Sequence, residues 1–212
     1  MRLVKICGNR TFEDTAVSIN QGADYIGFIF SSESRRQVKA NDVGRWMEAF
    51  PKEMRPKLVG VFVHPTIQFL EDVLAAVELD CIQLHGDEDE EFVKQVKEKF
   101  GLSVWKALPH HEHVIEEMEK FSRWVDGYVI DSRVKGMWGG TGVAFDWSNV
   151  SDYIIWAKNH RKLCFIAGGI TPENITELLE KGAENIDVAS GVETNEKKDV
   201  EKIAKLIEKV KG

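Results

Sequence analysis

Short apolar runs alternate with longer amphipathic stretches along this whole chain, and this repetition limits the possible folds more than any other feature. Each apolar run is compact and continuous, which is typical of a parallel strand buried on both faces. The expected strands are 3–7, 25–30, 57–63, 81–84, 103–107, 127–130, 163–167 and 186–189. The expected helices between them are 11–21, 41–50, 66–78, 88–100, 111–121, 147–159, 172–181 and 196–211.

Eight strand-then-helix units in 212 residues match the size of an α/β chain folded as a (β/α)8, or TIM, barrel with a parallel eight-stranded core. An open, doubly wound sheet is the alternative, but the first turn after a strand, CGNR at 7–10, lacks the glycine fingerprint of dinucleotide binding. Gly22 is expected to end the first helix, and Pro172 to lie in the first turn of the seventh. No linker or compositional break divides the chain, so residues 1–212 are expected to form a single domain.

Composition excludes several classes of function. The formal net charge is 28 − 35 = −7, so the broad basic surface of a nucleic-acid-binding protein is absent. The 3 cysteines have no disulfide or metal-site spacing, which favours a reducing cytoplasm. The first residues, MRLVKICG, lack the apolar core of a signal peptide, and no apolar stretch is long enough to span a membrane. We therefore expect a cytoplasmic protein with no membrane or nucleic-acid partner.

In a barrel of this kind, the residues that follow the carboxyl ends of the strands form the functional site. Cys7 ends the first apolar run, where it is either a small buried side chain or a reactive thiol. Asp131 ends the sixth run, where it either caps a turn or takes part in chemistry. A thiol and a carboxyl group at one barrel mouth would form a workable acid and base pair.

Two glycine-containing segments follow the last two strands. Gly168 and Gly169 come after the seventh strand, and Ser190 and Gly191 come after the eighth. Glycine lets backbone N–H groups approach a ligand closely, and the starts of helices favour anions. Barrels frequently bind phosphate with these two loops, so we expect a phosphorylated small molecule to bind here.

Three further groups are candidates for substrate binding. Arg35 and Arg36 follow the second strand, where an arginine can hold a carboxylate with two hydrogen bonds. His85 follows the fourth strand, although a single histidine is more often structural. Gly139 and Gly140 follow the sixth strand and belong either to a flexible surface loop or to a loop that closes over the ligand. No histidines have the spacing of metal ligands, so no metal is expected.

The motifs in these positions together resemble those of phosphoribosylanthranilate isomerases. The resemblance covers the chain from residue 3 to its last helix, in the same order. It is carried by KICG (5–8), GADYIGFIF (22–30), GVFV (60–63), QLHGDE (83–88), GGTG (139–142), FDW (145–147), AGGITPEN (167–174) and DVASGVE (187–193).

The resemblance implies a TIM barrel of the tryptophan pathway that acts without a cofactor, as a monomer or homodimer. The reaction is an Amadori rearrangement of N-(5-phosphoribosyl)anthranilate to 1-(2-carboxyphenylamino)-1-deoxyribulose 5-phosphate. The resemblance makes Cys7 the general base and Asp131 the general acid. It places the anthranilate carboxylate on Arg36, with Arg35 as the alternative.

Two alternatives remain at this stage. A related isomerase of histidine synthesis, or one serving both pathways, would resemble a barrel with two aspartates in the acid and base roles, and Cys7 argues against that. A barrel that binds a phosphosugar without catalysis would not need both Cys7 and Asp131.

The isomerase chemistry also requires the thiolate form of Cys7. Lys5 is the nearest cation in the sequence, and it lies on the same side of the strand if that strand is regular.

Overall fold

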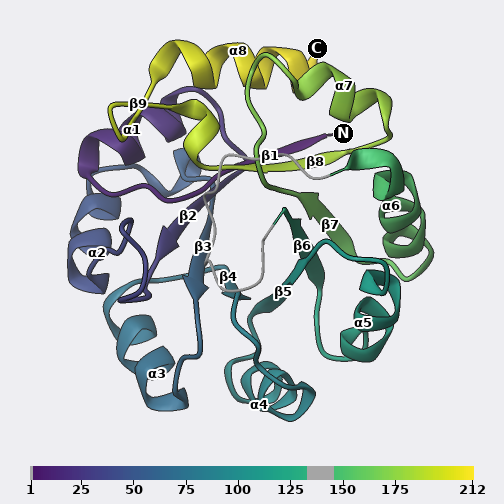
Figure 1. Cartoon of the computed structure of the whole chain (residues 1–212). Helices are drawn as coiled ribbons and strands as arrows, with labels where there is room; N and C mark the ends of the chain where they lie inside the picture. The colour runs from purple at the N-terminus through teal and green to yellow at the C-terminus, as the bar shows by residue number, and fades with distance from the viewer. Residues whose placement is uncertain (1, 133–145) are drawn as a thin grey trace.

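The computed structural model describes residues 2–132 and 146–212 and contains a closed barrel of parallel strands inside a ring of helices (Figure 1). Strands β1 to β8 pair in chain order, and β8 pairs with β1 to close the sheet. The strands are β1 Leu3–Ile6, β2 Tyr25–Ile29, β3 Lys57–Phe62, β4 Cys81–Leu84, β5 Ser103–Pro109, β6 Gly127–Asp131, β7 Leu163–Ile166 and β8 Asn185–Val188. The predicted barrel is confirmed, and the open sheet is wrong because β8 pairs with β1 and leaves no open edge between them.

One α-helix follows each strand and packs on the outside of the barrel (Figure 1). The helices are α1 Phe12–Asn20, α2 Ala40–Glu48, α3 Ile67–Ala76, α4 Glu90–Phe100, α5 Val114–Phe121, α6 Val150–Asn159, α7 Ile175–Glu180 and α8 Val200–Lys211. Three-residue 3-10 helices lie at η1 Lys52–Met54, η2 Trp147–Asn149 and η3 Ser190–Val192. All eight predicted strands and helices are present, with differences at their ends.

The predicted start of α7 is wrong. The helix begins at Ile175, so Pro172 lies in a turn before the helix and not in its first turn. Asn174 explains the delay, because its side chain accepts a hydrogen bond from the N–H of Thr171 and donates one to the carbonyl of Gly169. These bonds hold the loop after β7 in place before the helix begins.

The predicted starts of α4 and α8 are also too early. Asp89 caps α4 by accepting from the N–H of Phe92. Glu88 lies before the helix and pairs with Lys106. Before α8, strands β9 (Glu193–Thr194) and β10 (Lys197–Lys198) form a small antiparallel hairpin. A capping side chain satisfies the free N–H groups of a helix start, so the cap fixes where each helix begins.

Alternation along the strands divides the core into two layers. The larger layer lies between strands and helices, and the smaller one fills the barrel. Inside the barrel, Trp105 stacks on Phe165 with ring centroids 4.8 Å apart, and Tyr25 packs against both rings. This aromatic layer fills the middle of the barrel, and the pocket lies at the carboxyl ends of the strands. In the described part of the chain, no helix has the length and apolar character needed to cross a bilayer.

We expect Gly44→Ala to lower the melting temperature. A Cβ atom at Gly44 in α2 would lie 2.4 Å from the carbonyl oxygen of Ala76 in α3, so the two helices would have to separate. Overpacking of this kind costs about 1–3 kcal/mol, and each kcal/mol shifts the melting temperature by about 2–4 °C in a domain of this size. Helix propensity alone predicts the opposite, a gain of about 1 kcal/mol. A higher melting temperature, measured by calorimetry, would therefore contradict this packing.

Candidate active site at the carboxyl ends of the strands

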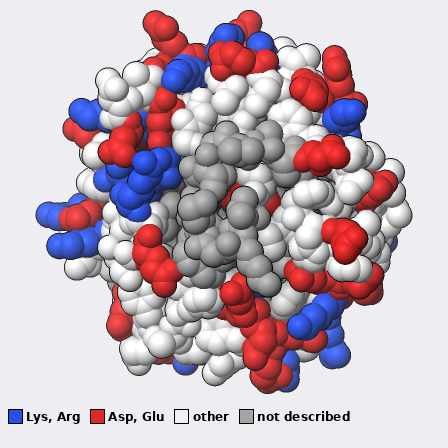
Figure 2. Space-filling model, in the orientation of Figure 1, with Lys and Arg blue, Asp and Glu red and all other residues white. Residues whose placement is uncertain are grey.

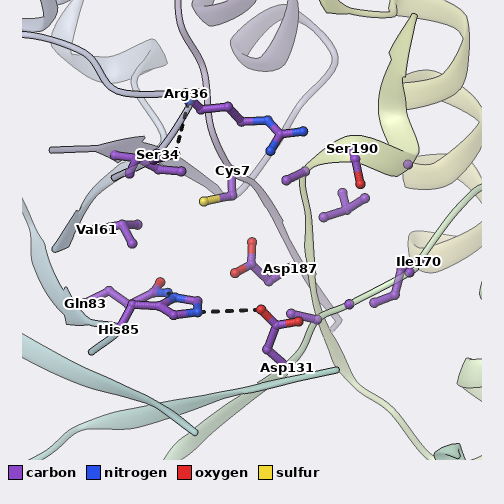
Figure 3. Close-up of a pocket in the computed structure, with 17 residues that line it drawn as sticks. Cys7, Ser34, Arg36, Val61, Gln83, His85, Asp131, Ile170, Asp187 and Ser190 are labelled. Atoms are coloured by element: carbon purple, nitrogen blue, oxygen red, sulfur yellow. Dashed lines mark hydrogen bonds and ion pairs between the residues drawn. The ribbon is translucent and has the colours of Figure 1, made fainter. Parts of the chain in front are cut away.

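A single pocket at the carboxyl ends of the strands contains most of the residues that the sequence singles out (Figure 3). The predicted residues that line it are Cys7, Arg36, His85, Asp131, Gly168, Gly169, Ser190 and Gly191. Gly139 and Gly140 lie outside the described residues, and the predicted closing loop with them. Among residues 2–132 and 146–212, no group of three or more His, Cys, Asp or Glu side chains could hold a metal ion.

Cys7 follows β1 directly, and its N–H donates to the carbonyl of Val188 at 2.8 Å. The neighbouring strand makes room for the thiol at Gly27, where a Cβ atom would lie 2.7 Å from Sγ. Burial raises the pKa of the Cys7 thiol, and the Lys5 ammonium acts in the opposite direction. The site therefore holds a thiol whose thiolate form depends on a neighbouring cation.

Lys5 provides that cation from within the barrel. It lies two positions before Cys7 on the same strand, so both side chains point inward. Its fully buried Nζ donates to Oδ2 of Asp187 at 2.7 Å and to Oε1 of Gln83 at 2.9 Å. Burial acts to lower the pKa of Lys5, but Asp187 and Cys7 outweigh burial and raise it. Lys5 therefore stays charged.

Asp131 is the last residue of β6 and is buried at the side of the pocket. His85 lies opposite, with its Nε2 atom 3.6 Å from Oδ2 of Asp131 (Figure 3). Nδ1 of His85 lies 3.0 Å from Nε2 of Gln83. Asp187 lies between Cys7 and Asp131 in Figure 3. Its Oδ1 atom is buried and has no hydrogen-bond partner among the described residues. Three acidic or nucleophilic groups thus share one pocket.

Of the two arginines after β2, Arg36 is the one in the pocket. Its guanidinium donates to both carboxylate oxygens of Glu193, from Nε at 2.9 Å and from Nη2 at 2.7 Å. Gly8, with φ at +74°, allows this position, because a Cβ atom there would lie 2.5 Å from Cδ of Arg36. Arg35 is exposed on the rim and pairs with Glu196. Figure 2 shows basic side chains gathered over β2 beside the mouth of the barrel.

A buried network holds Arg36 in place. Lys198 of β10 donates to Oε1 of Glu193 at 2.9 Å and to the carbonyl of Cys7 at 2.7 Å. Burial acts to raise the pKa of Glu193, but Arg36 and Lys198 outweigh burial and lower it. Glu193 thus occupies the edge of the guanidinium formed by Nε and Nη2. The edge that contains Nη1 donates no hydrogen bond to the described residues and can hold a second carboxylate in a bidentate pair.

The loops after β7 and β8 meet at the other end of the pocket. Gly168 and Gly169 have φ values of +84° and +64°, and a Cβ atom at Gly191 would lie 1.7 Å from the carbonyl oxygen of Ile170. Only glycine permits this contact. The N–H groups of Gly169 and Ile170 have no acceptor among the described residues, and Ser190 begins η3, where N–H groups lack acceptors within the helix. This end of the pocket can bind an anion.

Comparison with known proteins agrees with these features. The family model of N-(5′phosphoribosyl)anthranilate (PRA) isomerase matches residues 4–209. The protein of that name from Geobacillus thermodenitrificans is 44% identical over 208 residues, which cover 98% of this chain and 93% of the relative. The one from Bacillus velezensis is 45% identical over 207 residues, which cover 98% of this chain and 94% of the relative. This chain belongs to the PRA isomerase family.

Solved PRA isomerases have the same barrel. The enzyme from Thermotoga maritima matches this chain with a TM-score of 0.86 and 31% identity, over all of both chains. A second structure, with a TM-score of 0.83 and 30% identity over all of both chains, is of the isomerase in complex with reduced 1-(o-carboxyphenylamino)-1-deoxyribulose 5-phosphate. The family and the fold predicted from the sequence are therefore confirmed.

The sequence prediction missed several polar residues of this PRA isomerase site. They are Gln83, Asp187, Glu193 and Lys198, and Lys5 was considered only as a neighbour of Cys7. Three of these residues could have been found from the sequence: Lys5, Gln83 and Asp187. Each is a polar residue in an apolar strand, and each is the second-last residue of that strand. Lys198 gave no such signal, since the hairpin that buries it was expected to be helix.

We expect the alkylation of Cys7 by iodoacetamide to follow a pKa above the ordinary thiol value of about 8.5. Burial is the cause, and Lys5 limits the rise. Replacing the buried pair together, in Lys5→Met/Asp187→Asn, should raise this pKa further, because the effect of Lys5 on Cys7 exceeds that of Asp187. Mass spectrometry of the Cys7 peptide as a function of pH measures it.

The matched control for this measurement is Lys57→Met, which removes an exposed lysine at the start of β3, at the opposite end of the barrel. It should leave the alkylation profile of Cys7 unchanged. A profile that stays in place or moves to lower pH in the double variant would show that Lys5 does not stabilise the thiolate.

Proposed function

We propose that this chain converts N-(5′-phosphoribosyl)anthranilate to 1-(2-carboxyphenylamino)-1-deoxyribulose 5-phosphate in tryptophan biosynthesis, with Cys7 as general base and Asp131 as general acid. The observation that carries the proposal is the pocket itself. It combines a thiol, a carboxyl group, a buried arginine and two glycine-containing loops at one barrel mouth. The substrate has matching parts: a carboxylate at one end, a phosphate at the other and a sugar ring between them.

The two charged ends of the substrate account for its orientation. The phosphate would bind at Gly168, Gly169, Ser190 and Gly191, where backbone N–H groups and glycine permit close approach. The anthranilate carboxylate would bind the Nη1 edge of Arg36, which Glu193 holds in position. The ribose then lies over the centre of the pocket, within reach of Cys7 and Asp131.

The reaction needs one proton given and one taken. Asp131, when protonated, donates to the ring oxygen, the bond from this oxygen to C1′ breaks, and the nitrogen lone pair forms the C=N bond of a Schiff base. Cys7, as thiolate, removes the proton from C2′, and the electron pair moves toward nitrogen to give an enolamine. Tautomerisation gives the ketone. The Lys5 ammonium stabilises the thiolate. Lys5 lies deeper in the barrel than Cys7, so bound substrate need not displace Lys5.

The proposed reaction also bears on the domain extent, cellular location, partners and oligomeric state of the chain. The chain would act as a single domain over residues 1–212, in the cytoplasm, with a phosphorylated small molecule as its substrate and no cofactor or nucleic acid. It would act as a monomer or a homodimer. In support, the T. maritima isomerase is described as dimeric, and monomers generated from it have been solved.

Cys7→Ala and Asp131→Asn should each lower kcat by about 10²–10⁴-fold, because each removes a group that transfers a proton in the reaction. KM should change little, since both charged ends of the substrate bind elsewhere. Consumption of the fluorescent anthranilate substrate measures both constants. Cys164→Ala is the matched control, because Cys164 is buried in β7 away from the pocket. A kcat near that of the wild type in either variant would remove that residue from the mechanism.

The same variants test the function in cells. The wild-type chain should restore growth of a tryptophan auxotroph that lacks this isomerase, and Cys7→Ala should not. Folded wild-type protein that fails to restore growth and consumes no substrate would contradict the proposed function and favour a binding protein.

Arg36→Lys should raise KM by roughly 10–100-fold, which corresponds to the loss of about 1.5–3 kcal/mol from a hydrogen bond to a charged group. Lysine keeps the charge but cannot form the bidentate pair. Arg35→Lys is the matched control, because Arg35 is exposed and pairs with Glu196 on the rim. Steady-state kinetics distinguish the two, and a larger effect at Arg35 would move the carboxylate to that residue.

A further inference from the structure

We propose that Gln83 is a positioning residue that fixes the proton of the His85 ring on Nε2, facing Asp131. The proposal rests on the proposed function, because its consequence concerns Asp131 as the general acid. It starts from a chain of contacts across the barrel that begins with Lys5 on β1 and Gln83 on β4. The chain continues from Gln83 to His85 and then to Asp131 on β6 (Figure 3).

The first contact determines how the amide of Gln83 is turned. The Lys5 ammonium has only donors, and its Nζ atom lies 2.9 Å from Gln83. The amide must therefore present its carbonyl oxygen to Lys5. The reversed amide would place two groups of donors against each other in the closed interior of the barrel, where Gln83 is buried and Lys5 is fully buried. Asp187 holds Lys5 from the other side at 2.7 Å, so the ammonium cannot turn away.

The second contact determines the tautomer of His85. With its oxygen directed at Lys5, Gln83 directs its NH₂ group at Nδ1 of His85, 3.0 Å away. Nδ1 must then accept this hydrogen bond with its lone pair. In a neutral imidazole only one nitrogen carries a proton, so that proton lies on Nε2. A charge on β1 thus selects the tautomer of a ring after β4, through one amide.

The third contact gives the tautomer a role. Nε2 lies 3.6 Å from Oδ2 of Asp131, a distance that a small movement on substrate binding would turn into a hydrogen bond. A bare Nε2 would be an acceptor aimed at Asp131 and would compete with the substrate for its proton. A protonated Nε2 leaves that proton on Asp131. Once Asp131 has given its proton to the ring oxygen, the same N–H stabilises the new carboxylate.

Gln83→Glu tests this with a change of nearly the same shape. The new carboxylate still accepts from Lys5, but it also accepts from His85 and so draws a proton onto Nδ1. We expect long-range ¹H–¹⁵N NMR of histidine-labelled protein to show a protonated Nε2 and a bare Nδ1 for His85 in the wild type. In Gln83→Glu, Nδ1 should be protonated. His85→Asn assigns the signals.

We expect kcat to fall while KM stays unchanged, a combination that a general loss of structure would not produce. Gln83→Glu should lower kcat at least about 10-fold, which is part of the 10²–10⁴-fold that a general acid contributes, while KM stays within about twofold of wild type. Gln95→Glu, an exposed position on α4, makes the same change of charge and should match the wild type in both measurements. Gln83→Met removes the donor without adding charge, and should reduce the fraction of His85 with a bare Nδ1.

The outcomes are separable. A wild-type His85 with its proton on Nδ1, or a tautomer that Gln83→Glu and Gln83→Met leave unchanged, overturns the proposal. So does a kcat that stays at the wild-type value after the proton has moved. If Gln83→Glu does not fold, the long-range ¹H–¹⁵N NMR spectrum of Gln83→Met tests the tautomer of His85 instead. A wild-type chain without isomerase activity would overturn the proposed function and the role given to His85, whatever its tautomer.

Discussion

Closure of the sheet by the pairing of β8 with β1 is the constraint on which the site depends. Because the strands are parallel and the barrel is closed, all eight carboxyl ends meet at one mouth. Alternate side chains of every strand point into a single interior, which the aromatic layer of Trp105, Phe165 and Tyr25 fills from below. The pocket is therefore the part of the interior that this layer leaves open, and its chemistry comes from the last inward-facing residues of several strands.

Buried charged groups hold the pocket in shape. Lys5 pairs with Asp187 inside the barrel, and Glu193 receives both Arg36 and Lys198 above it. Removing one partner of a buried pair leaves an uncompensated charge and costs about 3–5 kcal/mol, so these pairs fix positions even where they add little net stability. They connect the first two units of the chain to the last one, at the side of the barrel where the sheet closes.

A fourth buried pair supports the opposite side of the site. Lys106 of β5 donates to Oε2 of Glu88 at 3.0 Å, and Glu88 accepts from the backbone N–H groups of His64 and Gly86. Gly86 is next to His85, so the loop that carries His85 is held by a charge on the outer side of the barrel. Glu88 could not be assigned this role from the sequence, where it belongs to a run of acidic residues that predicts the start of a helix.

The sequence by itself determined the fold class, the approximate position of each strand and helix, and the presence of Cys7 and Asp131 at strand ends. Each of these depends on apolar periodicity and on neighbours along the chain, which are local properties. Only the tertiary structure decided that Arg36 and not Arg35 lies in the pocket, that Glu193 and Lys198 hold it, and that Lys5 contacts Gln83 and Asp187. These partners lie 78 and 182 positions from Lys5 in the sequence. They meet because barrel closure sets the distances between strands, and no local pattern contains that information.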